Sequence, residues 1–461
     1  MSISQEGLTA KASTISIMLC VRDSEPLIKL CNALDFNHLS QIVLPDMQKT
    51  KKGLWWLGRK LYLRIHLGAL ILQCLLKRSD RELEKLILQT PIHQVFCGYG
   101  QVEKWKCPDH TKIEEFRNRL HPQTHKKIGD YVLRVAYDLG FADPTWVDID
   151  STVQEANIAY PSDATLMQKL ATTAHKVLHY MQSTLTDLVP SELGINMGSI
   201  KKLAKEYFFL SKNTNIEKKR DVFNAYYEQV KSQLLPIIGF LEELNPLMFL
   251  SMPWNIHRAL ETLQNHGRQY LKNVAYFIEN HTIAPGKLLS FHAQAVACIH
   301  KGKIGKENEF GRVYQLGRIG GNFMVAYQCS NVRMEDKSSL TTVIKEHGEL
   351  FGSKVLQSVG TDKGYYSQQN IKAISAMGIN TQGIQRPANI KKKPSGEEVR
   401  QLRNRRAGIE PLIGHVKDFG LRKSKMKSDA ATLSSGYRSV MGFNLHQLKR
   451  HLMEAVTQAA A

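Results

Sequence analysis

Three carboxylates stand where the chain could form a metal site. Asp150 lies in the apolar run 147–152, Asp362 follows the apolar run 355–361, and Glu410 lies in a long charged segment. Burial disfavours an Asp in an apolar strand unless a cation compensates its charge. Mg²⁺ takes oxygen ligands and keeps places for water and phosphate. Two such ions about 4 Å apart activate an attacking oxygen and stabilise a leaving one. Asp150, Asp362 and Glu410 are therefore predicted to hold metal for phosphodiester chemistry.

Asp148 is an alternative to Asp150 as the primary ligand. Residues two apart in a strand point to the same face, so both carboxylates can approach one site. We assign Asp150 to the metal. Asp148 is assigned to the entry of the strand or to a supporting position behind the ligand.

The carboxylates need strands and helices that bring them together. Residues 144–152 have the composition of a strand, and residues 312–327 read as a hairpin around a glycine turn. Alternating helices and strands follow, at 338–351, 355–361, 367–377 and 379–384, and a long charged helix spans 397–417. This order predicts an α/β fold in which a mixed sheet is flanked by helices.

Two helical regions accompany this pattern. Residues 1–140 are read as an N-terminal helical region, either a helix-turn-helix that binds DNA or a packing domain. Residues 166–290 are read as a large helical insertion after the first core strand, which lies in 141–165. The remainder of the core and the C-terminal helices are assigned to residues 291–461.

The charge of the chain favours a polyanionic partner. Lys and Arg number 62 against 42 Asp and Glu, which gives a net charge of +20. Thirteen basic residues oppose four acidic ones between Arg386 and Lys427. Because this segment surrounds Glu410, it predicts a track for the DNA backbone.

Other classes of site and location find little support. Cys107, His121 and His125 lack the second nearby cysteine of a zinc finger, and no phosphate-binding loop for ATP is present. The seven cysteines are scattered, and the longest uncharged run in 55–76 has 12 residues, too short to span a bilayer. We expect a soluble cytoplasmic protein that associates with the nucleoid and not with membranes.

The motifs together resemble those of a known family. The blocks Asp150–Glu155 and Asp362–Tyr365 resemble the surroundings of the first two acidic residues in bacterial insertion-sequence DDE transposases. Arg406, Glu410 and Lys417 match the spacing of that family's Tyr-Arg-Glu-Lys signature, but Arg403 replaces the Tyr. Residues 96–120 are also similar to the family's N-terminal helical region.

The resemblance implies a ribonuclease-H-like core and a transposition reaction. Asp150, Asp362 and Glu410 would hold Mg²⁺, which Mn²⁺ can replace. The enzyme would bind the inverted repeats of its element, cleave to free a 3′-hydroxyl and join it to target DNA. It would act without ATP, as a homodimer or larger assembly on DNA. Together with the basic run, the resemblance implies that the following residues contact DNA: Arg403, Arg406, Lys417, Lys391, Lys392, Lys393, Arg422 and Lys423.

Three alternatives remain open at the level of sequence. A metal-dependent nuclease on the same fold would only hydrolyse DNA. A DNA-binding protein derived from a transposase would not cleave at all. Within the site, Arg406 is spaced either to hold a phosphate or to pair with Glu410 four residues later on one helix.

Overall fold

The computed structural model divides the chain into two compact units. Unit 1 comprises Met1–Asn157 and Ala297–Ala461, and unit 2 comprises Ile158–Val296. The structure describes residues 25–48, 60–103, 105–185, 188–210, 214–245, 252–293, 296–303, 306–329, 333, 335–379, 381–384 and 397–460.

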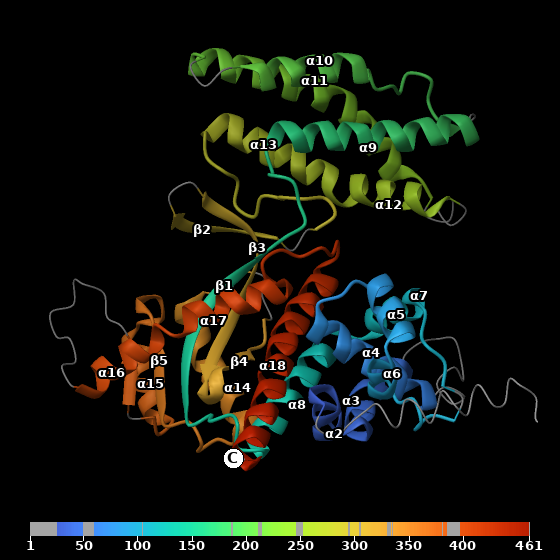
Figure 1. Cartoon of the computed structure of the whole chain (residues 1–461). Coiled ribbons are helices and arrows are strands. Elements are labelled where there is room, and N and C mark those ends of the chain that lie inside the picture. Colours follow the sequence, from blue (N-terminus) through green and yellow to red (C-terminus); the bar gives the residue numbers. More distant parts are fainter. Residues whose placement is uncertain are drawn as a thin grey trace, which may run out of the picture. The chain divides into compact units, whose positions relative to one another are not determined.

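A mixed sheet forms the centre of unit 1 (Figure 1). Its strands are β1 (Trp146–Glu155), β2 (Ala297–Lys303), β3 (Lys306–Ile319), β4 (Phe323–Ala326), β5 (Ser358–Thr361) and β6 (Thr381–Ile384). The order is β2-β3-β1-β5-β6, and β4 also pairs with β3. β1 is antiparallel to β3 and parallel to β5, which is parallel to β6. The predicted hairpin, β3 with β4, and the predicted mixed sheet are confirmed.

The helices of unit 1 cover both faces of this sheet. They are α2 (Pro26–Ala33), α3 (Phe36–Gln48), α4 (Lys60–Leu76), α5 (Asp80–Gln89), α6 (Pro91–Phe96), α7 (His110–Arg119), α8 (Pro122–Asp138), α14 (Asp336–Phe351), α15 (Gln368–Ala376), α16 (Glu397–Arg406), α17 (Ile409–Val416) and α18 (Asp429–Ala460). Short turns η6 (Lys363–Tyr365) and η7 (Lys417–Leu421) follow β5 and α17.

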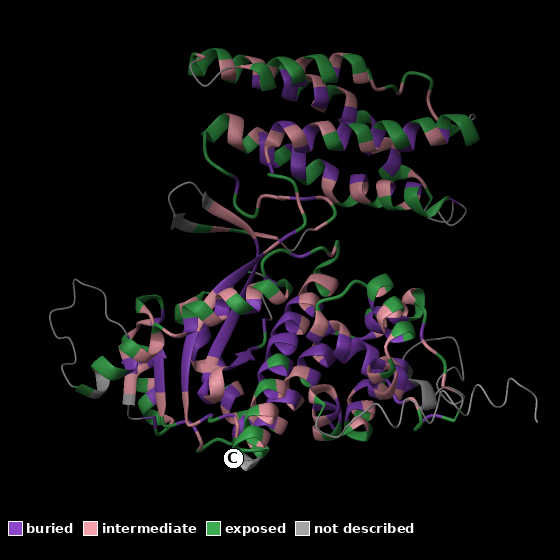
Figure 2. Cartoon of the chain, viewed as in Figure 1, coloured by how far each residue is buried: buried purple, intermediate pink, exposed green. Residues whose placement is uncertain are grey.

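The side chains of β1 alternate between an apolar face and a face that carries two aspartates. Val147 and Ile149 belong to a core cluster that includes side chains of α4 and α8, so the N-terminal helices share their core with the sheet. Buried residues run through both the sheet and these helices (Figure 2). Asp148 and Asp150 point to the other face, because side chains alternate along a strand. On that face Leu316 of β3 packs with side chains of α17 and η7.

Unit 2 is helical and has a core of its own. It contains α9 (Asp163–Thr184), α10 (Met197–Phe209), α11 (Ile216–Glu243), α12 (Trp254–Thr262), η4 (Leu263–Gly267) and α13 (Arg268–Asn280). In the chain it lies between β1 and β2. Its buried side chains recur at helical spacing, which explains the apolar pattern of the sequence.

The expected single helix over 397–417 is wrong, because the chain breaks between α16 and α17. Gly408 and Pro411 interrupt the helix, because proline cannot donate to the carbonyl of residue 407 and its ring clashes with it. On β3, Nη1 of Arg318 donates to the carbonyl of Arg405 at 2.9 Å. The same nitrogen lies 2.0 Å from the position that a Cβ of Gly408 would take, so a larger residue there would displace Arg318. Arg406 and Glu410 therefore stand on different helices.

A glycine of α18 tests this packing. A Cβ on Gly436 would lie 2.1 Å from Oη of Tyr314, a buried residue of β3. We expect Gly436→Ala to lower the free energy of unfolding by about 1–3 kcal/mol, because the ring has no room to move. Gly129→Ala on α8 is the matched control, since its Cβ would meet only Met441 at 3.6 Å. Alanine should stabilise α8 by about 0.5–1 kcal/mol. Urea unfolding measures both, and equal effects would contradict the proposed packing.

Candidate active site

The pairing of β1 with β5 places two of the predicted carboxylates side by side. Val147 pairs with Val359 and Asp148 pairs with Gly360 in parallel register. Asp150 follows Asp148 by two residues, and Asp362 follows Gly360 by two residues. Asp362 follows the last residue of β5 and caps η6, since its Oδ1 accepts from the Gly364 amide at 2.8 Å. The carboxylates thus meet where β5 ends.

Arg406, the last residue of α16, lies between these two carboxylates. Its Nη2 is 3.3 Å from Oδ2 of Asp150 and 4.0 Å from Oδ2 of Asp362. The side chains are 12%, 18% and 33% exposed for Arg406, Asp150 and Asp362 respectively. The sequence left a phosphate or Glu410 as the partner of Arg406, whereas the structure pairs Arg406 with the two aspartates.

Burial makes ionised Asp150 unfavourable. It raises the pKa of the Asp150 carboxyl from 3.8 to about 6. Arg406 and a hydrogen bond from the Ser151 amide lower that pKa, whereas the neighbouring carboxylates Asp362 and Asp336 raise it. The single guanidinium therefore compensates this acidic cluster only in part.

Asp336 is a nearby carboxylate that the sequence reading missed. It begins α14, and its Oδ1 accepts from Nε2 of Gln315 at 3.0 Å. Oε1 of Gln315 accepts from the hydroxyl of buried Tyr365 at 2.5 Å. These bonds tie the turn after Asp362 to β3 and α14. In the sequence Asp336 precedes a helical pattern, so it reads as a helix start and carries no separate signal.

Asp148 belongs to a different cluster, in which two arginines compensate much of its charge although burial still raises its pKa. It is completely buried, and Oδ1 accepts from Nη2 and Nε of Arg405 at 2.9 and 3.1 Å. Nη1 of Arg318 is 4.0 Å from Oδ2. Both guanidinium groups lie over the Trp146 ring, at 4.2 Å for Arg405 and 5.6 Å for Arg318. The cluster anchors the end of α16 to β1 and thereby positions Arg406.

Glu410 is exposed in the first turn of α17, a helix that contacts β1 and β3. Within the described part of the chain, no three His, Cys, Asp or Glu residues are grouped so that they could hold a metal ion. The structure thus brings Asp150 and Asp362 together without Glu410. Two carboxylates that share one positive group still suit a hard cation, since Mg²⁺ needs only one or two protein carboxylates beside water and phosphate.

The predicted DNA contacts have varied surroundings. Arg403 is half-buried in α16, and Lys417 begins η7. Arg422 is exposed and pairs with Asp418 at 2.9 Å. Lys423 forms a β-bridge with Glu155 at the end of β1. Residues 391–393, the three predicted lysines, lie outside the described residues.

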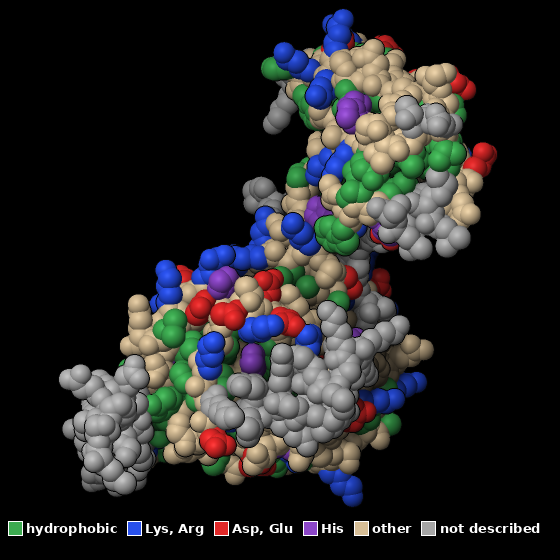
Figure 3. All heavy atoms as spheres, turned by 90° about the vertical axis from the view of Figure 1, so that its right-hand side faces the viewer, with side chains coloured by type: hydrophobic (Ala, Val, Ile, Leu, Met, Phe, Trp, Pro, Cys, Tyr) green, Lys and Arg blue, Asp and Glu red, His purple; other side chains and the backbone are tan. Residues whose placement is uncertain are grey.

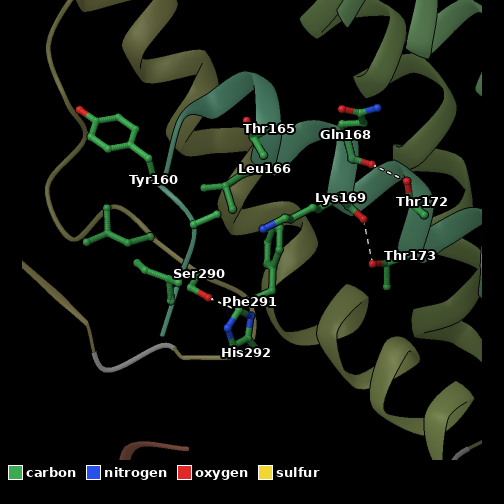
Figure 4. Close-up of a pocket in the computed structure, with 13 residues that line it drawn as sticks. Tyr160, Thr165, Leu166, Gln168, Lys169, Thr172, Thr173, Ser290, Phe291 and His292 are labelled. Atoms are coloured by element: carbon green, nitrogen blue, oxygen red, sulfur yellow. Dashed lines mark hydrogen bonds between the residues drawn. The ribbon is translucent and has the colours of Figure 1, made fainter. Parts of the chain in front are cut away.

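Unit 2 contains a separate cavity of about 460 Å³ (Figure 4). Tyr160, Lys169, Phe291 and His292 are among the residues around it, and Ser290 Oγ lies 3.2 Å from His292 Nδ1. The described residues that line it include no Asp or Glu. Its chemistry is therefore unlike that of the carboxylate site in unit 1.

Residues 318–434 match the family model described as the transposase DDE domain. The chain carries a transposase DDE domain. The match includes Asp362, Arg406 and Glu410, whereas Asp150 precedes it on β1. The resemblance found in the sequence motifs is thereby confirmed.

One curated relative adds a short similarity. The "Uncharacterized protein ORF8 in nfe locus" of Rhizobium meliloti is 30% identical over 94 residues, which are 20% of this chain and 45% of that protein. The chain thus spans less than half the length of this relative. No solved structure matches the chain. Within the described residues, no helix is long and apolar enough to cross a membrane.

The two aspartates of β1 should respond oppositely to loss of charge in metal-free buffer with EDTA. Asp150→Asn should stabilise the protein at pH 7.5 by up to about 2–3 kcal/mol, because ionised Asp150 is disfavoured above its pKa of about 6. The gain should shrink as the pH falls from 6 towards 4, where Asp150 is protonated in the wild type. Chemical unfolding at several pH values measures this.

Asp148→Asn is the matched control on the same face of β1. It leaves Arg405 without its buried carboxylate, and we expect a loss of about 3 kcal/mol at pH 7.5. Similar losses for both variants would show that Asp150 is as well compensated as Asp148.

Proposed function

We propose that this protein is a transposase that cleaves DNA with a divalent metal ion and transfers the freed strand to a target. The observation that carries the proposal is that Asp150 and Asp362 both lie close to Arg406 at the ends of adjacent parallel strands. Asp362 and Arg406 lie within the matched DDE domain, and Asp150 precedes it. The order β4-β3-β1-β5-β6, with three antiparallel strands followed by two parallel ones, supports a ribonuclease-H-like core.

Asp150 and Asp362 are proposed to hold Mg²⁺, for which Mn²⁺ can substitute. The ion would supply activation of the attacking oxygen and stabilisation of the leaving one. Glu410 is proposed as the third carboxylate because of its place in the family signature and the contact of α17 with β1. Tyr365 and Gln315 keep the Asp362 turn in position.

Arg406 is proposed to bind the phosphate beside the metal. Once a cation neutralises the aspartates, the guanidinium has a surplus charge that a phosphate can satisfy in bidentate geometry. The other predicted contacts, Arg403, Lys417, Arg422 and Lys423 with residues 391–393, would hold the backbone and give affinity without sequence information. Inverted-repeat ends and target DNA are the proposed substrates, bound by a homodimer or larger assembly.

Cleavage of the DNA that flanks the coding sequence tests the function. We expect Mg²⁺-dependent nicking and joining by the wild type. Asp150→Asn and Asp362→Asn should each lose at least about 10³-fold in cleavage rate, because the metal supplies several kcal/mol to the transition state. Binding of the same DNA should persist. Glu349→Gln, an exposed change on α14, is the control and should keep activity.

The alternatives give different results in this assay. Nicking without joined products would favour the nuclease that only hydrolyses. Salt-dependent binding without cleavage in Mg²⁺ or Mn²⁺ would favour the DNA-binding protein.

Arg406 should affect metal binding and DNA binding in opposite directions. Without DNA, Arg406→Gln should bind Mn²⁺ about tenfold more tightly, since a positive group 3–4 Å from the carboxylates opposes the ion. DNA binding should weaken. Calorimetric Mn²⁺ titration measures the first effect, and Arg406→Lys, which keeps the charge, is the control. Weaker Mn²⁺ binding by Arg406→Gln would mean that Arg406 supports the ion rather than replacing it.

A further inference from the structure

A second cavity in unit 1 has the properties of an anion site. Its volume is about 500 Å³, and it lies between the junction of α4 with α5, the segment from η7 onward, and α18. Its basic lining residues are Lys77, Arg78, Arg117, Lys423, Lys425 and Arg438, and its acidic ones are Asp80, Glu82 and Asp418. On the face of unit 1 that Figure 3 shows, Lys and Arg side chains are interspersed with Asp and Glu side chains.

Buried Arg117 and half-buried Arg438 line the cavity with one carboxylate, Asp80, near both of them. Arg117 donates to both oxygens of Asp80, and Gln73 Nε2 donates to Oδ1 at 2.6 Å. Arg438 instead lies against His125, with Nη1 3.4 Å from Nε2. Burial keeps the pKa of His125 well below its usual value, so this partner is neutral, and burial also lowers the pKa of Arg438 to about 10. Two guanidinium groups thus share one carboxylate, which leaves one positive charge in surplus.

The acidic side chains at the rim already have partners. Glu82 accepts from the amide and hydroxyl of Ser79 in a capping box at the start of α5. Asp418 pairs with Arg422 at 2.9 Å. Glu82 keeps its charge and also interacts with Arg78 and Lys425. Six basic side chains nevertheless line the cavity against three acidic ones, so the cavity as a whole attracts negative charge.

The cavity lies beside the end of β1, the strand that carries Asp150, because one of its lining residues pairs with that strand. Lys423 bridges Glu155, which stands five residues after Asp150 on that strand. At about 3.3 Å per residue the separation is about 17 Å. Each base pair of B-DNA advances about 3.4 Å along its axis, so this distance corresponds to about five base pairs. A duplex cleaved at Asp150 can therefore reach the cavity.

We propose that this cavity binds a backbone phosphate of the DNA substrate about five base pairs from the reacting phosphate. The α4–α5 junction, through Lys77 and Arg78, then forms part of the DNA-binding surface together with the segment after η7. The inference rests on the proposed function, because it places that function's substrate.

Salt-dependent binding of a duplex of arbitrary sequence tests the proposal, since phosphate contacts do not depend on sequence. The double variant Lys77→Gln/Arg78→Gln should lower the slope of log K against log salt by about 2 and weaken binding about tenfold near 0.15 M salt. The control Lys127→Gln/Lys372→Gln removes the same charge from exposed positions on α8 and α15 and should leave the slope unchanged. An unchanged slope in the first variant would overturn the proposal.

Arg438→Gln gives a second readout that does not depend on the rim. Removing a surplus charge should weaken duplex binding without lowering the melting temperature of the DNA-free protein, whereas Arg438→Lys should bind as the wild type does. Full affinity in Arg438→Gln would overturn the proposal. The proposal would also be overturned if inorganic phosphate raised the melting temperature of the protein as much as the duplex does, since the site would then serve a free anion.

The control measurements separate this proposal from the proposed function. Cleavage by the wild type together with an unchanged salt slope in Lys77→Gln/Arg78→Gln would overturn only the proposal that the cavity binds a phosphate. Loss of salt-dependent duplex binding by the wild type itself would remove the proposed function.

Discussion

Charge compensation between β1 and the end of α16 determines the arrangement of the site. Two successive arginines of α16 pair with alternate aspartates of β1, Arg405 with Asp148 and Arg406 with Asp150. The first pair is buried, bidentate and supported by Trp146, so it fixes where α16 ends. The second pair is more open and shares its guanidinium with Asp362. The buried Arg405–Asp148 pair thus holds the more open Arg406–Asp150 pair in place on the same face of the sheet.

Local patterns were sufficient to predict the sheet and the meeting of two carboxylates. The alternation of side chains along β1 and the helix–strand order that leads to β5 can be recognised in short stretches of sequence. Once β1 and β5 are adjacent and parallel, Asp150 and Asp362 come close together. Gly408 and Pro411 signal the break between α16 and α17 within the sequence. The hydrogen bond that Arg318 donates to the end of α16 was not predictable from neighbouring residues, because Arg318 lies on another strand. Asp336 was missed for a similar reason, since only Gln315 and Tyr365 bring it to the site.

Arg406 also helps to stabilise the partly buried acidic cluster of Asp150, Asp362 and Asp336. A guanidinium is always charged and donates in a fixed plane, so it favours ionised Asp150, whose pKa burial raises. A divalent cation carries more charge and would compensate the carboxylates better. In the proposed function the two cations would compete for the same oxygens, and binding of the metal would release Arg406 to pair with another anion.

In the proposed function this competition would couple metal binding to DNA binding along β1. Asp150, Asp362 and Asp336 form a negative centre, which by itself repels a phosphate. The basic cavity near Glu155 lies about 17 Å further along the strand. DNA held only by such outlying positive groups would meet the negative centre at its reacting phosphate. A cation there would convert that repulsion into attraction and would free Arg406 for the same phosphate, so tight binding at the reacting bond and readiness for chemistry would arise from one change in local charge.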